Sequence, residues 1–579
     1  MIDPYKMVLV NVVASSVLLL GILFYRNIYP KRKINYFVLL LLISTLPIIS
    51  IFRKGVYESG DFSLHLYRTI SFYNALLEGH FLPSWAAELN AGYGYPLFIF
   101  NYPLPYYVIS LFHFLGFSYV ASMKLFLSSN FILSGLFMYL WTKDIFKNSF
   151  AAFTAVIFYQ FAPYHLIDLH FKITIGEIVT FTLLPLTFYF VNRSLTKKAA
   201  NYIFLAGIFF SFLIMSHVVI ALFSALLILI YSITLENGKN LTRKFFVSLS
   251  SLALGSILSL HVWLTPFFLS QYTILQKIQL TSIDSRPLWQ LLFSPWRLGL
   301  LFQGPKGEIS HLIGYMHLFV VIVLFILLVA KKIPDKSINH IRFWLVSFIV
   351  LIFLITPLSN FLWKIIPFIG ITGNHRLLIL VVFSASVLAG YLCLLYLKKK
   401  KLIYLLIGIA VFSTILNWGN RRVIPEINDT VLFAQVWKST SKGEGHFYAN
   451  SKWRDIKDPW FSQRPKNYIE IAKGQGEIKN LKRSSINHAY IAYAKTPLSL
   501  KENTLYFPGW QVKVNNKIVP IDYQKTGLIK FSIPKGLSFI EVSYKDVPIY
   551  RAMKNISVGG FLLVSGYLLR SRFKRTFRR

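Results

Sequence analysis

The chain has 579 residues, of which 55% are hydrophobic and only 15% are charged, and its mean hydropathy is +0.54. This balance excludes a wholly soluble protein and is typical of a membrane protein. The formal net charge of +38 raises the question of a nucleic-acid partner, which the distribution of the charges must answer. The single cysteine, Cys393, excludes an internal disulfide and a thiolate metal site.

Thirteen hydrophobic segments follow one another along the chain, several of them near the length that a bilayer core requires. We predict that each is a membrane-spanning helix. The predicted spans are residues 7–25, 36–52, 121–142, 150–163, 176–193, 201–216, 217–235, 245–268, 312–330, 342–358, 376–397, 402–418 and 555–570. Residues 103–117 are interpreted as an interfacial helix, because counting them as a span would place the basic loop at Lys143 and Lys147 outside.

Basic residues gather in every second loop, among them Lys198 and Lys239, and in the tail from Arg570 to Arg579. These segments hold about 26 of the 61 Lys and Arg residues but only about three of the 23 acidic residues. This asymmetry follows the positive-inside rule and makes a nucleic-acid partner unnecessary. We therefore expect a multi-pass protein of the cell (plasma) membrane, with its N-terminus outside and its C-terminus inside.

Two segments are too polar to span the membrane: a first external loop, residues 53–120, and residues 419–554. The second segment alternates between apolar and polar residues at 504–514, turns at Asn515-Asn516 and continues with further short apolar runs. This pattern predicts an extracytoplasmic β-sandwich. The predicted fold is thus a polytopic α-helical membrane protein with a β-rich C-terminal domain. Its predicted divisions are a membrane domain, 1–418, which includes the first loop; a β-rich domain, 419–554; and a last helix with a basic tail, 555–579.

Ionisable residues gather at the predicted external ends of the spans rather than at mid-membrane. They include Asp61, His65 and Arg68 in the first loop, then Asp168, His170, Lys172 and Glu177, then His217, then Glu308, His311 and His317, and finally His375 and Arg376. We expect these groups to converge on one external cavity. A transporter would more often carry charges within its spans and show duplicated halves, so the pattern favours a surface-facing enzyme.

Asp61, His65 and Arg68 fall at positions i, i+4 and i+7 of a helix, so they share one face. The alternative interpretation is an ordinary polar face with an Asp–His contact. The other candidates have ordinary structural interpretations too. Arg376 would then be an interfacial anchor, His217 a polar contact at a helix tip, and Glu177 a helix cap.

Several phrases resemble the GT-C superfamily of membrane glycosyltransferases, and within it the bacterial YfhO-like and pyruvoyl-tetrahydropterin-synthase-related membrane proteins. The phrases are Asp61-Phe62-Ser63-Leu64-His65, Leu82-Pro83-Ser84-Trp85, the run from Gly92 to Phe98 that includes Tyr95, Gly176-Glu177, Ser216-His217, Thr356-Pro357-Leu358-Ser359, His375-Arg376 and Phe507-Pro508-Gly509-Trp510. The chain departs from the family where an arginine-glycine pair often precedes the glutamate: Lys172-Ile173-Thr174-Ile175 stands there instead. No Cys/His zinc constellation supports pterin synthase chemistry.

The resemblance implies transfer of a sugar from a polyprenyl-phosphate donor to an extracytoplasmic glycan, lipid or protein. In that reaction Asp61 would be the general base, assisted by His65. Arg376, with Lys172, Arg68, His217 and His375, would bind the lipid phosphate. Glu177 would bind substrate, or join Asp61 around a divalent Mg or Mn ion, the one cofactor that these residues suggest. Trp85, Tyr95 and the neighbouring aromatics would stack on sugar, although aromatic residues are enriched at membrane interfaces in any case.

Two other functions remain open at this point. One is a lipid-linked glycan transporter, and the other is a nonenzymatic envelope scaffold whose β-rich domain binds partners. The Asp61→Asn substitution separates them from an enzyme, because only an enzyme would lose the formation of new glycosidic bonds.

Overall fold

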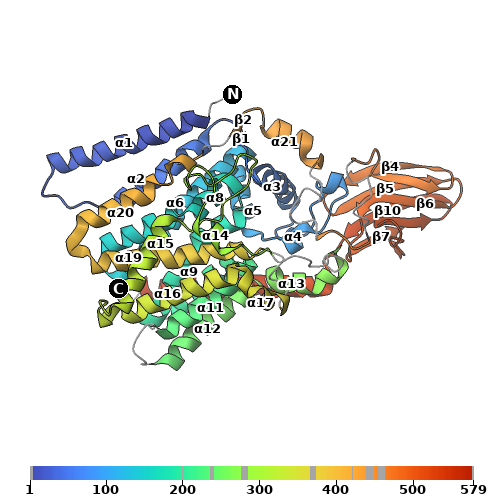
Figure 1. Cartoon of the computed structure of the whole chain (residues 1–579). Helices are drawn as coiled ribbons and strands as arrows, with labels where there is room; N and C mark the ends of the chain where they lie inside the picture. Colours follow the sequence, from blue (N-terminus) through green and yellow to red (C-terminus); the bar gives the residue numbers. More distant parts are fainter. Residues whose placement is uncertain are drawn as a thin grey trace.

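The computed structural model describes residues 4–197, 200–234, 240–274, 284–365, 373–419, 422–438, 449–453 and 463–576. Among the basic positions noted above, Lys198, Lys239, Arg578 and Arg579 lie outside the described residues, as do positions 366–372 of the segment before His375. The described part consists of a large helical region and a β-sheet region at one end of it (Figure 1).

Eight helices in the described residues are long and apolar enough to cross a membrane, or nine if one bent pair counts as a span. The eight spans correspond to α1 (Pro4–Ile28), α6 (Tyr119–Phe146), α9 (Ile175–Lys197), α12 (Leu241–Leu258), α16 (Asp335–Ile355), α19 (Leu378–Leu395), α20 (Lys400–Phe412) and α22 (Pro548–Thr576). The bent pair joins α7 (Ser149–Gln160) to α8 (Pro163–Ile167) and its π-helical continuation η3 (Asp168–Lys172), with a bend of 49°. Shorter apolar helices are α2 (Tyr36–Ile48), α5 (Leu104–Phe114), α10 (Ala200–Ile214), α11 (Val218–Thr234) and α15 (Tyr315–Val329).

Every one of the thirteen predicted spans overlaps one of these helices or the bent pair, and the predicted interfacial helix overlaps α5. The fold class, a helical membrane protein with a C-terminal β-sheet region, is confirmed. The number of crossings and the side of the membrane on which each loop lies stay predictions.

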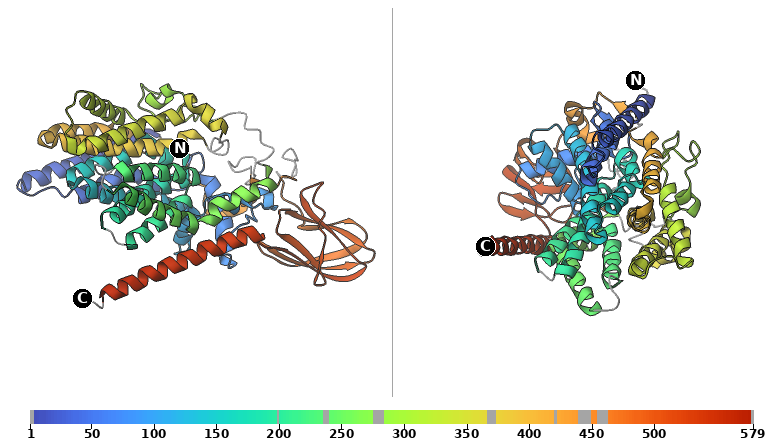
Figure 2. Two further views of the ribbon diagram at one scale, coloured as in Figure 1. Left: turned by 90° about the horizontal axis from the view of Figure 1, so that it is seen from below. Right: turned by 90° about the vertical axis from the view of Figure 1, so that its left-hand side faces the viewer.

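Burial sorts the helices into an inner and an outer set. The most apolar stretches of α9 and α19 are 89% and 94% buried, whereas those of α1 and α22 are only 17% and 11% buried. Helices α1 and α22 run along the outside of the helical region (Figures 1 and 2). Their exposed apolar faces suit contact with lipid, and the inner helices carry the site described below.

Local signals fix the helix ends. Asn148 begins α7 by accepting hydrogen bonds from the backbone N–H groups of Phe150 and Ala151, at 2.9 and 3.0 Å. Lys147, just before it, is left-handed at φ 51° and ends α6. This tight connection makes α6 and α7 neighbours and sets the start of the bent pair.

The first loop is structured throughout. It contains β1 (Val56–Tyr57), α3 (Phe62–Leu77), α4 (Leu97–Phe100) and α5, and β1 pairs antiparallel with β2 (Val423–Ile424). Other short helices are α13 (Leu260–Leu269), α14 (Leu288–Leu292), α17 (Asn360–Ile365), η7 (Asn374–Leu377), α21 (Asp429–Gln435) and η10 (Val436–Lys438).

The C-terminal strands form two antiparallel sheets. One sheet has the order β4-β5-β10-β7-β8 and the other the order β3-β6-β9. The strands are β3 (Ile469–Lys473), β4 (Gly476–Arg483), β5 (Asn487–Ala494), β6 (Leu498–Leu505), β7 (Trp510–Val514), β8 (Lys517–Val519), β9 (Leu528–Ile533) and β10 (Gly536–Tyr544). Side chains of β4 and β5 contact Glu502 of β6 between the sheets, so the sheets pack face to face as predicted. From this region α22 runs back along the helices (Figure 2). The three-part division of the chain made from sequence stays a prediction.

Candidate active site

A buried carboxylate at the start of α9 is the centre of the site. Glu177 is fully buried and accepts a hydrogen bond from the Tyr164 hydroxyl at 2.7 Å and one from Arg376 at 3.0 Å. The Lys172 ammonium lies 3.4 Å from Glu177 and 3.0 Å from the Asp168 carboxylate, which is also fully buried. Two cations thus neutralise two carboxylates drawn from α9 and η3.

The chain reaches this arrangement through an unusual turn. Asp168–Lys172 form one turn of π-helix, and Ile173 follows with φ 58° and ψ 45°, a left-handed conformation that is costly for a β-branched residue. Its backbone N–H closes the turn on the Asp168 carbonyl at 2.9 Å. Strained backbone of this kind gathers at functional sites because the surrounding contacts must hold it.

Asp61 is fastened to the same turn. The backbone N–H groups of Gly60 and Asp61 donate to the carbonyls of Phe171 and Lys172, at 2.8 and 2.9 Å. A Cβ on Gly60 would lie 3.0 Å from the Lys172 carbonyl oxygen, so glycine permits this close approach. Burial raises the pKa of the Asp61 carboxyl, and the charges of Arg68, Lys172 and Arg376 oppose that rise. Asp61 is therefore a carboxylate shifted toward the range in which a general base works well.

His65 and Arg68 lie one and two turns further along α3, both buried. The Nδ1 atom of His65 is 3.0 Å from the Tyr106 hydroxyl, and burial, with Arg68 adding to it, holds the pKa of His65 well below its usual value. The shared helix face is present, but the structure directs His65 to Tyr106 and gives it no hydrogen bond to Asp61 within the described residues. Arg68 is fully buried, and its charge acts on both Asp61 and Tyr106.

His217 joins the cluster at the break between α10 and α11. Its Nε2 atom is 3.1 Å from an Arg376 nitrogen, and the Tyr102 ring stacks on it with centroids 6.4 Å apart. A Cβ on Gly176 would lie 2.5 Å from the Ser216 carbonyl oxygen and 2.9 Å from the Tyr102 ring. The glycine before Glu177 therefore lets α9 begin against this break.

A cavity of about 510 Å³ opens beside the cluster. Its basic lining comes from Lys172 and Arg286, with His311 and His375 next to them, and Glu308 is the one acid among its lining residues. Trp289 and Trp296 form an aromatic wall, and Trp289 is 55% exposed. Such a lining favours an anionic group attached to an apolar one.

Asp284 holds two of these groups in place. Its carboxylate lies 3.1 Å from Nδ1 of His375 and 2.7 Å from Arg286. The contact with His375, assisted by Arg286, lowers the pKa of Asp284 to about 2. The rings of His311 and His375 meet edge to face with centroids 4.8 Å apart. His375 therefore belongs to the cavity wall, while its neighbour Arg376 binds Glu177.

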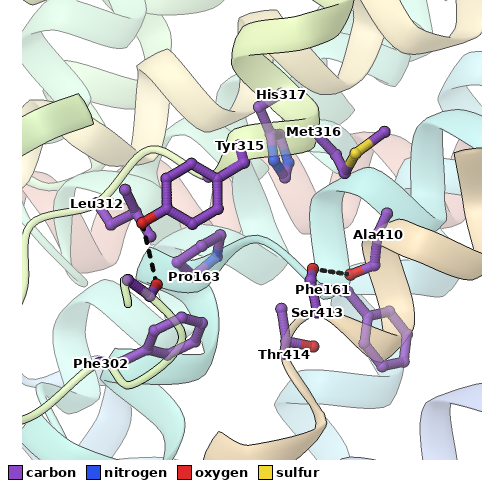
Figure 3. Close-up of a pocket in the computed structure, with 12 residues that line it drawn as sticks. Phe161, Pro163, Phe302, Leu312, Tyr315, Met316, His317, Ala410, Ser413 and Thr414 are labelled. Carbon is purple, nitrogen blue, oxygen red and sulfur yellow. Dashed lines mark hydrogen bonds between the residues drawn. The ribbon is translucent and has the colours of Figure 1, made fainter. Parts of the chain in front are cut away.

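A second, small cavity of about 20 Å³ lies at the bend of the α7–α8 pair, where Phe161 and Pro163 line it (Figure 3). Pro163, Tyr315 and His317 line it, the Tyr315 hydroxyl donates to the Gly299 carbonyl at 3.0 Å, and His317 contacts the Phe158 carbonyl at 2.7 Å. This space is about the size of a single water. His317, expected near the external cavity, supports the bend instead.

The two aromatic candidates from the first loop are not open to a sugar. Trp85 is 2% exposed and packs edge to face on Trp510 with centroids 5.2 Å apart, and Tyr95 is fully buried. Sugar stacking needs an accessible ring face, so this part of the sequence-based interpretation is corrected. Trp85 joins the first loop to the sheet region through Trp510 and Tyr544, whereas Tyr95 pairs with Ala86 inside the first loop.

Sequence reasoning brought together Asp61, Arg68, Lys172, Glu177, His217 and Arg376, which the structure places in one cluster. It missed Tyr164, Asp284 and Arg286 as contributors. The adjacent acid and base in Asp284-Ser285-Arg286 were a usable signal, whereas Tyr164 follows an ordinary apolar stretch. Within the described residues, no three His, Cys, Asp or Glu side chains are grouped so as to hold a metal, and a site of two carboxylates stays a prediction.

Comparison with known proteins places the chain in a family. A family model for the 6-pyruvoyl-tetrahydropterin synthase related domain, a membrane protein, matches residues 99–422. That range holds Lys172, Glu177, His217 and Arg376, and Asp61 precedes it. An uncharacterized protein of Lactococcus lactis subsp. cremoris (strain MG1363) is 25% identical over 346 residues, which are 58% of this chain and 55% of that protein. The chain thus spans about half the length of this relative.

Among solved structures, the chain is similar to the oligosaccharyltransferase of Archaeoglobus fulgidus. The acceptor-peptide-tethered form is 14% identical with a TM-score of 0.41, over 68% of this chain and 55% of that one. It is also similar to the mycobacterial arabinofuranosyltransferase AftD, at 12% identity and a TM-score of 0.45, over 69% of this chain and 27% of that one. Because both TM-scores are below 0.5, the family of the chain is assigned from the family model alone, which covers more than half of the chain. The chain belongs to the family of 6-pyruvoyl-tetrahydropterin synthase related membrane proteins.

Proposed function

We propose that the protein is an integral membrane glycosyltransferase that moves a sugar from a polyprenyl-phosphate donor to an extracytoplasmic acceptor. The observation that carries the proposal is the position of Asp61. This carboxylate, with a pKa raised by burial, is hydrogen-bonded through its backbone to Lys172, and Lys172 also lines the basic cavity with the aromatic wall. Lys172 thus contacts the proposed base and also lines the proposed anion-binding cavity.

The donor fits the cavity in two parts. Its phosphate would lie against Lys172, Arg286 and His375, and its polyprenyl chain would leave along Trp289 and Trp296 toward lipid. Glu177 would hold Lys172 and Arg376 in position rather than bind sugar, because it already accepts from both of them and from Tyr164.

The reaction would be a direct inverting displacement. Asp61 takes the proton of the acceptor hydroxyl as its oxygen attacks the anomeric carbon. The bond between that carbon and the donor phosphate oxygen breaks, and the electron pair leaves with the lipid phosphate, whose developing charge the basic lining stabilises. The acceptor would be a glycan, a lipid or a protein, and the positive-inside rule would place the transfer outside the plasma membrane.

The test is sugar transfer by the purified full-length protein in detergent or proteoliposomes. A panel of polyprenyl-phosphate sugars is supplied with membrane-derived acceptors, and mass spectrometry follows glycosylated product and released polyprenyl phosphate. Product from at least one donor is expected, with loss of both signals in Asp61→Asn. The matched control is Asp335→Asn, an exposed carboxylate at the start of α16, which should keep full transfer. Donor binding without any turnover would favour a lipid-linked glycan transporter.

A further inference from the structure

A third cavity, of about 420 Å³, lies where the first loop meets the sheet region. Its walls come from the C-terminal end of α3 and the loop after it, from α21 and η10, and from the segments around β3 and β4. The lining residues that matter here are Glu78, Glu88, Trp437, Tyr468, Arg464 and Arg483. None of them belongs to the cluster around Glu177, and the volume lies in the range of roughly 300–1,000 Å³ typical of small-molecule sites.

Hydrogen bonds hold the polar walls in place. Both carboxylate oxygens of Glu78 accept from the Ser485 backbone N–H, at 3.0 and 2.9 Å, which joins the loop to the sheet region. Arg483 is fixed by Glu502 at 2.8 Å, and its guanidinium lies over the Tyr468 ring at 4.1 Å from the centroid. Arg464 donates to the Tyr468 hydroxyl at 2.9 Å. A ligand would therefore meet donors and acceptors that are already oriented.

Glu88 is the least expected group in this cavity. It accepts hydrogen bonds from the Ser71 hydroxyl at 2.5 Å and the Asn74 amide at 2.6 Å, both neutral donors. Burial raises the pKa of Glu88, against those two hydrogen bonds. Because neither of these donors is cationic, the Glu88 carboxylate beside the cavity retains lone pairs for a ligand hydroxyl.

The charges of the lining decide the class of ligand. Two carboxylates, Glu78 and Glu88, stand against two guanidiniums, Arg464 and Arg483, so neither a phosphate nor an ammonium group gains a net attraction. Planar carboxylates and guanidiniums suit pairs of neighbouring hydroxyls, and the rings of Trp437 and Tyr468 suit apolar C–H faces. A neutral sugar carries both features on one small molecule.

We propose that this cavity, between the first loop and the sheet region, is a binding site for a neutral glycan, separate from the transfer centre. Glu78, Glu88, Arg464 and Arg483 bind its hydroxyls, and Trp437 packs against a sugar face. The proposal is independent of the proposed function, because a glycan can bind here whether or not the protein transfers a sugar.

The experiment measures binding by the full-length protein in detergent. Fluorescently labelled protein is applied to an array of neutral and anionic oligosaccharides, and the best neutral oligosaccharide is then titrated against the wild type and variants. Trp437→Ala and Glu88→Gln should each weaken binding about tenfold or more, and Trp437→Phe, which keeps an aromatic face, should weaken it less. Tyr493→Ala, an exposed ring on β5 that lines neither cavity, is the matched control and should leave the affinity unchanged.

Thermal melting of each variant checks that it folds, and Trp437→Phe with Glu88→Gln keeps the test valid if Trp437→Ala does not fold. Asp61→Asn should bind glycan as the wild type does, so failure of sugar transfer and failure of glycan binding are separate results. The proposal is overturned if no neutral oligosaccharide binds, if only anionic ones bind, or if Trp437 and Glu88 substitutions leave the affinity intact.

Discussion

Two fully buried glutamates, Glu177 in the helical region and Glu502 in the sheet region, have closely similar surroundings. Glu177 contacts Arg376, Lys172 and Tyr164, with His217 against Arg376. Glu502 contacts Arg483 at 2.8 Å, His488 at 2.5 Å, Tyr490 at 3.2 Å and Thr504 at 3.0 Å. The two glutamates have nearly the same kinds of partner, so a buried ionic network by itself does not identify an active site.

The difference lies in what adjoins each network. Beside Glu177 are a second buried carboxylate, a strained turn, the raised-pKa Asp61 and a basic cavity. Glu502 is enclosed between two sheets, where its contacts tie β4 and β5 to β6. We therefore propose that the network around Glu177 serves the chemistry, while the contacts of Glu502 hold the two sheets together.

The substitutions Glu177→Gln and Glu502→Gln test this difference between the two networks most strongly. Each substitution leaves buried cationic partners uncompensated, so each should cost about 3–5 kcal/mol in the free energy of unfolding. Sugar transfer should fall at least ~100-fold in Glu177→Gln, because Lys172 and Arg376 lose their anchor, and should stay near wild type in Glu502→Gln. Thermal melting and transfer assays on folded protein measure the two effects, and equal loss of transfer in both variants would contradict the assignment.

Acid should weaken the sheet region through Glu502. Burial of Glu502 opposes its ionisation, but the charges and hydrogen bonds of His488 and Arg483 prevail and lower its pKa to about 2. A lowered pKa contributes stability above the ordinary value of 4.5, and that stability is lost as pH falls through 4.5 toward 2. The loss should approach about 3 kcal/mol. Melting curves between pH 7 and pH 3 should show a smaller change for Glu502→Gln, and an equal acid shift in both proteins would refute this role.

The packing at the start of α9 gives a smaller effect. A Cβ at Gly176 would press on the Ser216 carbonyl oxygen and Tyr102, so Gly176→Ala should destabilise by about 1–3 kcal/mol. Gly566 in α22 is the matched control: no heavy atom lies within 4 Å of its added Cβ, and Gly566→Ala should stabilise by about 0.5–1 kcal/mol. The melting temperature should fall in Gly176→Ala and rise in Gly566→Ala. A rise in Gly176→Ala would show that Ser216 and Tyr102 move aside at little cost.

The smallest expected effect on stability is that of Asp61→Asn, and its sign is opposite to that of most substitutions of buried residues. Its pKa is raised in the folded protein, so its ionisation opposes folding as pH rises above the ordinary value. Asp61→Asn should therefore be at least as stable as the wild type at pH 7. A clear drop in melting temperature for this variant would indicate that Asp61 is held for structure rather than for chemistry.

The sequence predicted what local patterns determine. Runs of apolar residues located the helices, and the alternation at 504–514 located strands β6 and β7, because both signals depend on neighbouring residues. Charges at the ends of apolar segments pointed to the cluster, since those ends gather at one face of the helical region.

Contacts between distant residues escaped sequence reasoning. Trp85 meets Trp510 from more than 400 positions away, so its burial could not be read from the first loop alone. The 49° bend and the π-helical turn after Pro163 shape the site. From sequence, residues 150–163 stood out only as short for a span, with a re-entrant hairpin as the alternative. The pairing of Asp284 with His375 likewise joins two loops that only the fold brings together.

The most direct test of Asp61 as the base is the single-turnover rate of sugar transfer with donor bound in advance, for the wild type and Asp61→Asn. Preloading the donor separates loss of chemistry from loss of binding. Asp61→Asn should bind donor normally and release polyprenyl phosphate at least ~100 times more slowly. Transfer by Asp61→Asn at the wild-type rate would contradict the assignment of Asp61 as the base.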